Sequence, residues 1–104
     1  MSDVWEELLL AGYNNTEQYE IRRLMAGWGN GSLNTPAHCI VYHANRHGFL
    51  NKYLLYLRVA NNFNKKGARE KPLENALRWE RPNGEFLIER DGLVIVYGRN
   101  SSRR

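Results

Sequence analysis

The chain has 104 residues, 42% of them hydrophobic and 25% charged, proportions that are ordinary for a globular domain. This length supports one hydrophobic core, so we expect a single domain over residues 1–104. No apolar run approaches the roughly 18 residues of a membrane span, and the first residues lack the basic and apolar regions of a signal peptide. The single cysteine, Cys39, excludes an internal disulfide and lies in an apolar segment, which predicts a buried thiol.

Charge is distributed unevenly along the chain. Residues 1–44 carry two arginines and five carboxylates, a net charge of −3, whereas residues 45–104 carry thirteen lysines and arginines against six carboxylates, a net charge of +7. Such asymmetry favours a polyanion or an acidic protein bound by the C-terminal part. The alternative is a mixed, solvated surface.

The N-terminal part, residues 1–35, has the pattern of two short helices. Asp3 can cap a helix that runs to about Ala11. Thr16 is expected near the start of a second helix, which ends before the glycine-rich stretch 27–34. No lysine-threonine pair follows these glycines, so we interpret the stretch as a connector and not as a phosphate loop.

The middle part, residues 36–64, is predicted to hold two more helices. Thr35-Pro36 combines an N-cap residue with a proline of the first turn, and the helix should run to His47 with Gly48 in the left-handed position after it. Apolar residues at three- and four-residue steps then predict a helix over 51–63.

The C-terminal part, residues 74–100, reads as an antiparallel meander of about three strands. Asn83-Gly84 and Asp91-Gly92 are hairpin turns, and the segment 68–73 before the sheet is expected to be a basic loop broken by Pro72. Helices first and strands afterwards indicate an α+β fold, with N-terminal helices packed on a small C-terminal sheet.

His43 and His47 are the candidate chemical groups of the predicted third helix. Their i, i+4 spacing puts both on one helix face. They could be structural residues near the negative end of the helix dipole, a zinc pair, or an acid/base pair. Zinc binding would need a third ligand and usually a glutamate between the histidines, and Ala44-Asn45-Arg46 stands there instead.

The neighbouring cations favour acid/base chemistry on RNA. Breaking an RNA phosphodiester needs a base for the 2′-hydroxyl, an acid for the 5′-oxygen and cations for the phosphate, roles that histidine and arginine fill. The sheet offers arginines, and Tyr97 supplies a hydroxyl beside the last of them. Strand alternation places Tyr97 and Arg99 on one face and Gly98 on the other. The candidate phosphate-binding residues are Arg46, Arg78, Arg81 and Arg99, with Arg90 as a further sheet cation.

Several of these segments together resemble a known family. They are Arg46-His47-Gly48-Phe49, the helix Tyr53–Phe63, Arg81-Pro82-Asn83-Gly84, Asp91-Gly92 and Val94–Tyr97. The stretch from about 43 to 97 is similar to the C-terminal toxin domains of colicin D and of contact-dependent-inhibition and other polymorphic, bacteriocin-like toxins. Their shared element, a basic residue and histidine leading into a Tyr-x-x-x-Ala-x-x-Phe helix, falls on Arg46-His47 and on Tyr56, Ala60 and Phe63.

The resemblance implies a barnase/EndoU/colicin/RelE-like fold and a metal-independent ribonuclease without a cofactor. It further implies tRNA as the substrate, a target-cell cytoplasm as the place of action, and an acidic immunity protein as the partner of a monomeric toxin. His47 would be the principal acid/base, with Arg46 on the phosphate and His43 as a second proton carrier. The family's later catalytic polar residue has no unique counterpart, because Arg81, Tyr97, Arg99 and Ser101 compete for it.

Two other functions fit the same sequence. The chain could be a non-catalytic RNA- or DNA-binding module whose Trp79, Phe86 or Tyr97 stack on bases. It could also be a phage-type protein inhibitor of a host enzyme, which would need no catalytic histidine. Incubation with RNA in the presence of EDTA would give discrete fragments only for the ribonuclease.

Overall fold

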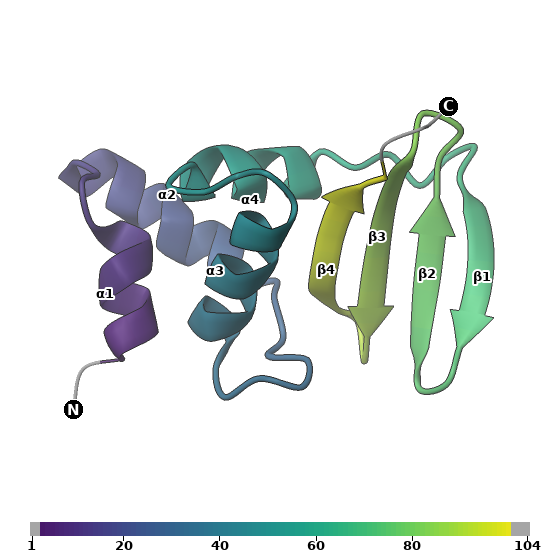
Figure 1. Ribbon diagram of the computed structural model, residues 1–104, viewed down its shortest axis with the longest axis horizontal. Helices are drawn as coiled ribbons and strands as arrows, with labels where there is room; N and C mark the ends of the chain where they lie inside the picture. The colour runs from purple at the N-terminus through teal and green to yellow at the C-terminus, as the bar shows by residue number, and fades with distance from the viewer. Residues whose placement is uncertain (1–2, 101–104) are drawn as a thin grey trace.

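The computed structural model describes residues 3–100, which form four helices followed by four strands. The helices gather at one end of an elongated molecule and the strands at the other (Figure 1). This arrangement confirms the α+β class. The elements are α1 (Val4–Leu10), α2 (Asn15–Met25), α3 (Pro36–Arg46), α4 (Tyr53–Asn61), β1 (Arg69–Leu73), β2 (Ala76–Glu80), β3 (Glu85–Arg90) and β4 (Leu93–Arg99).

Side-chain caps fix where the first three helices begin. The predicted caps of α1 and α3 are confirmed, since Asp3 accepts a hydrogen bond from the backbone of Trp5 and Thr35 accepts one from that of His38. Thr16 lies near the start of α2 as expected, but it is not the capping residue. Asn14 caps α2, and its partner in a complete capping box is Glu17, because the asparagine carboxamide accepts from the N3 backbone as well as a threonine would.

The sheet is a four-stranded antiparallel meander in the order β1-β2-β3-β4. It contains one strand more than the three expected, because the segment read as a basic loop is the edge strand β1. Pro72 is compatible with that place, since an edge strand can turn a residue without an N–H toward solvent. The predicted turn at Asp91-Gly92 has both residues at positive φ, as a two-residue hairpin turn requires.

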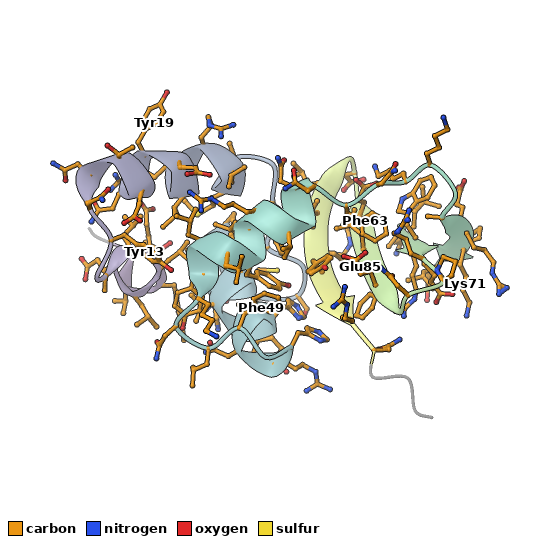
Figure 2. All side chains as sticks on the ribbon, turned by 90° about the horizontal axis from the view of Figure 1, so that it is seen from above. Tyr13, Tyr19, Phe49, Phe63, Lys71 and Glu85 are labelled. Atoms are coloured by element: carbon orange, nitrogen blue, oxygen red, sulfur yellow. The ribbon has the colours of Figure 1, made fainter. Side chains whose placement is uncertain are left out.

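The helices meet the sheet along β4, the strand nearest to them in Figure 1. The stretch interpreted as a connector takes part in this junction: Trp28 forms a parallel bridge with Val94 and is buried. The Tyr56 hydroxyl of α4 donates to the carbonyl of Tyr97 at 2.6 Å and accepts from its N–H at 3.1 Å. Figure 2 shows Phe63 at the same junction, over the strands. The outer edge of β4 is therefore hydrogen-bonded at Val94 and Tyr97.

One hydrophobic cluster joins the two halves and is centred on α3 and α4. The prediction of a buried Cys39 is confirmed: its side chain is fully buried and its Sγ donates to the carbonyl oxygen of Ile95. Burial raises the pKa of this thiol to about 11. No helix within residues 3–100 combines the length and the apolar character that crossing a membrane requires.

Candidate active site

The last turn of α3 brings the two histidines against the sheet. The His47 ring packs edge-on against Phe86 of β3, with ring centroids 5.5 Å apart. His43 lies one turn earlier, 6.2 Å from His47 and nearly parallel to it. As predicted, Gly48 has a left-handed φ of +91°, which ends the helix at this point. The shared helix face inferred from the sequence is thus the face turned toward the strands.

Gly98 of β4 leaves the space that the His47 ring occupies. A Cβ atom on Gly98 would lie 2.8 Å from His47 Nδ1 and 2.7 Å from Cζ of Phe86. Both separations are shorter than van der Waals contact, so only a glycine fits here. Sequence reasoning did not select Gly98, and it named Phe86 only as a base-stacking candidate of a binding module. The available signal was the glycine itself, because a glycine inside a strand marks a close approach by another group.

Two arginines of the predicted set lie close to this ring system. Arg46 immediately precedes His47, is exposed, and forms no hydrogen bond or ion pair within residues 3–100. The Arg78 guanidinium lies 4.1 Å from the centre of the Phe86 ring. Its charge is partly balanced by Glu80, to which it donates a hydrogen bond of 2.5 Å. Arg46 is therefore the better placed of the two to bind an anion.

The surroundings of both histidines lower their pKa and so favour the neutral imidazole. Burial, followed by the nearby His47 and Arg46, lowers the pKa of His43 from its ordinary value of 6.5 to about 4. Burial and the Arg46 charge also lower the pKa of His47. The Nδ1 atom of His43 is buried and has no hydrogen-bond partner among the described residues. A neutral imidazole can accept a proton, which is the state a general base needs.

The structure does not bring Tyr97 to the histidines. The register pairs Tyr97 with Leu87 and Gly98 with Phe86, so Tyr97 lies on the sheet face opposite to the one that His47 contacts. Its hydroxyl donates to Glu85 at 2.6 Å, and burial together with this carboxylate raises its pKa. Arg99 belongs to the same face as Tyr97. The separation expected from strand alternation is confirmed, and it removes Tyr97 from the site.

The other sheet arginines are engaged elsewhere. Arg81 donates to the carbonyl oxygens of Asn64 and Lys66 and lies 3.8 Å from Glu85. Arg90 donates to the carbonyl of Gly31 at 3.5 Å. Ser101, a candidate for the last catalytic position, lies outside the described residues. The assembled site thus consists of His47, His43, Arg46 and Arg78 around Phe86.

No three His, Cys, Asp or Glu side chains within residues 3–100 lie close enough together to hold a metal ion. Comparison with known proteins finds no matching family model, no similar curated protein and no similar solved structure. Support for a function therefore comes from the residues of the site.

Proposed function

We propose that this chain is a metal-independent endoribonuclease that cleaves RNA by attack of the 2′-hydroxyl, with His47 as the proton-transferring residue. The observation that carries the proposal is the placement of the His47 ring. The ring is half-buried and fixed between Phe86 and Gly98, and burial lowers its pKa. Arg46, which has no hydrogen-bond or ion-pair partner within residues 3–100, directly precedes it.

In this mechanism Nε2 of His47 faces the substrate, because Nδ1 faces the backbone of Gly98. Nε2 accepts the proton of the 2′-hydroxyl, and the 2′-oxygen then bonds to phosphorus as the bond to the 5′-oxygen breaks. The products are a 2′,3′-cyclic phosphate and a 5′-hydroxyl, whose proton is the one that His47 accepted from the 2′-hydroxyl. We assign to His43, the neighbouring imidazole, the role of second carrier: in its neutral form it accepts this proton from His47 and passes it to the 5′-oxygen. Arg46 would bind the non-bridging phosphate oxygens, where charge develops.

The substrate and partner belong to the same proposal. Its tRNA substrate, its toxin role and its acidic immunity protein are taken from the resemblance to polymorphic toxin domains. The net charge of +7 over residues 45–104 supports both a polyanionic substrate and an acidic inhibitor.

A non-catalytic RNA-binding module is the second candidate. The lowered pKa of both histidines favours it, because burial disfavours the protonated form that a general acid needs. Such a module would use the same cations to bind phosphates without breaking them.

Incubation of the purified chain with total RNA in EDTA separates the two. We expect discrete fragments with cyclic-phosphate ends, and a loss of cleavage by about 10²–10⁴-fold for His47→Ala. That variant should keep the parental circular dichroism spectrum and RNA affinity, because His47 lies at the end of its helix. RNA that stays intact with the parental protein, or a His47→Ala protein that cuts at the parental rate, would contradict the proposal.

A further inference from the structure

We infer that the groove between α1 and α3 is a nucleobase subsite, which holds a base of the bound RNA beside the phosphate at Arg46 and His47. This inference rests on the proposed function, because it assigns a role to a surface next to the same site. This aromatic groove is not used by the reaction itself.

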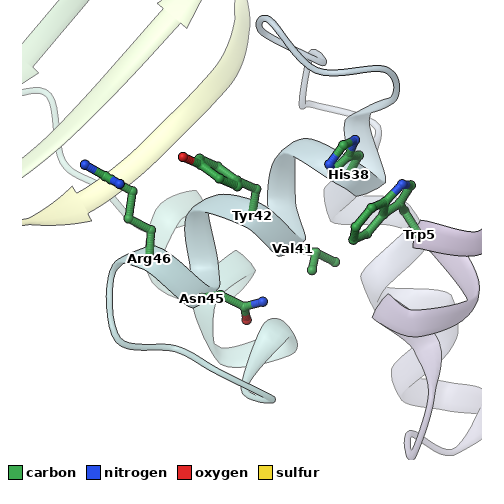
Figure 3. Close-up of a pocket in the computed structure, with 6 residues that line it drawn as sticks. All are labelled: Trp5, His38, Val41, Tyr42, Asn45 and Arg46. Atoms are coloured by element: carbon green, nitrogen blue, oxygen red, sulfur yellow. The ribbon is translucent and has the colours of Figure 1, made fainter.

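The groove is open and has a volume of about 380 Å³ (Figure 3). Trp5 of α1 forms one wall, and its indole stacks on the His38 ring with centroids 4.0 Å apart and planes 2° from parallel. The other lining residues come from successive turns of α3: Val41, Tyr42, Asn45 and Arg46. Flat aromatic walls of this kind accept nucleobases by stacking.

Two residues connect the groove to the candidate active site. Tyr42 lines the groove and is 46% exposed, while its ring packs edge-on against His43 at 5.0 Å. Arg46 lines the groove and directly precedes His47. In Figure 3 both side chains extend from α3 on the side nearer the strands. A nucleotide whose phosphate binds Arg46 therefore has an aromatic surface within reach of its base.

The polar groups of the groove suit a base rather than a cationic ligand. The hydroxyl of Tyr53 donates to Oδ1 of Asn45 at 3.0 Å, which orients the carboxamide. Its two N–H donors have no partner within residues 3–100. Nucleobase edges carry the carbonyl and ring-nitrogen acceptors that such donors bind. Among the described residues that line the groove there is no carboxylate, and Arg46 gives it a positive charge. Stacking, donation and phosphate binding are thus all available to one nucleotide.

The test uses a short mixed-sequence oligonucleotide that carries 2′-O-methyl groups, since it lacks the attacking hydroxyl and reports binding alone. A parallel set replaces each base in turn by an abasic residue. Affinity is measured with the parental protein, with Tyr42→Ala, and with Tyr19→Ala as a matched control. Tyr19 is 70% exposed, points outward from α2 (Figure 2) and is not one of the residues that line the groove. Trp5 fluorescence is compared in the parental protein and in Trp5→Phe.

We expect Tyr42→Ala to weaken binding by about 5- to 150-fold, the range for loss of one base stack, and Tyr19→Ala to leave it unchanged. One abasic position should lower affinity to a similar extent, and Tyr42→Ala should cause no further loss with that oligonucleotide. Binding should quench a fluorescence component that Trp5→Phe lacks. Unchanged melting temperatures would show that the variants are folded.

Binding that leaves Trp5 fluorescence and the Tyr42→Ala affinity unchanged would overturn the inference. The outcome is separate from that of the proposed function. If the protein cuts RNA but fails these binding tests, the proposed function stands and the nucleobase subsite is refuted. If it passes them but does not cut RNA, the subsite stands and the chain is a binding module.

Discussion

Gly98→Ala is the most direct test of how the His47 ring is held. Gly98 is buried and its φ lies outside the left-handed region, so the backbone itself accepts an alanine. The added Cβ, however, would lie 2.7 and 2.8 Å from two carbons of Phe86 and 2.8 Å from His47 Nδ1. Carbon atoms in contact are about 3.5–4.0 Å apart, so both rings would have to move.

The cost of such overpacking is about 1–3 kcal/mol. For a domain of this size each kcal/mol lowers the melting temperature by about 4–8 °C. The rate of RNA cleavage should fall more strongly, because a displacement of a catalytic group by about 1 Å can lower the rate roughly 10²-fold. Thermal melting followed by circular dichroism, and RNA cleavage well below the melting temperature, measure the two effects separately.

Two further variants sharpen this test. Gly27→Ala is the matched control, since its Cβ would meet only the Leu24 carbonyl oxygen at 3.7 Å, an ordinary contact, and its stability should change by less than about 0.5 kcal/mol. Phe86→Leu in the Gly98→Ala background removes the ring clash but leaves the one with His47, so it should restore stability more than cleavage. A Gly98→Ala protein that melts and cleaves like Gly27→Ala would refute the packing described for His47.

Three other predictions follow from the structure. Because the pKa of His43 is about 4 in the folded protein and near 6.5 when unfolded, the unfolded chain binds the extra proton between these values. The melting temperature should then be highest above pH 6.5 and fall toward pH 4, and His43→Gln should flatten this acid limb. Tyr56→Phe removes the hydroxyl that pairs with the buried N–H and carbonyl of Tyr97, and it should lower the free energy of unfolding by about 1–3 kcal/mol. Tyr97→Phe should lower that free energy less and leave RNA cleavage unchanged. If Tyr97→Phe abolished cleavage, Tyr97 would belong to the catalytic site after all. Arg46→Ala should weaken RNA binding and reduce the dependence of this binding on salt concentration. Arg22→Ala removes only an exposed ion pair with Glu6 and should leave RNA binding unchanged. Equal effects of the two variants in a filter-binding assay would show that the site is misplaced.

Local signals predicted most of the fold. The caps at Asp3 and Thr35 and the turn at Asp91-Gly92 depend on a few neighbouring residues, and all three are confirmed. The prediction was wrong where two neighbouring residues were equally suited to cap one helix, and where a strand forms only by pairing with a segment elsewhere in the chain. Asn14 competed with Thr16 for the same cap, and β1 is exposed and carries Pro72, so it has the composition of a loop and becomes a strand only by pairing with β2.

The candidate site was predicted only in part for the same reason. The i, i+4 spacing of the two histidines is a local property, and it correctly placed them on one face. Which strand that face meets depends on the docking of α3 and on the sheet register, so Phe86 and Gly98 could not be selected from spacing. Strand alternation already separated Tyr97 from Gly98, and the docking of α3 determined which side holds the histidines.

The two outer strands of the sheet have different neighbours, and this bears on self-association. An open strand edge is a template to which another chain can add by backbone hydrogen bonding. On β4 that edge is occupied by the Trp28 segment and the Tyr56 hydroxyl. On β1 it is exposed but carries alternating charges and Pro72, features that oppose strand addition. Growth of the sheet into a fibril or a swapped dimer is therefore hindered at both of its edges, by covering groups on β4 and by charge and proline on β1.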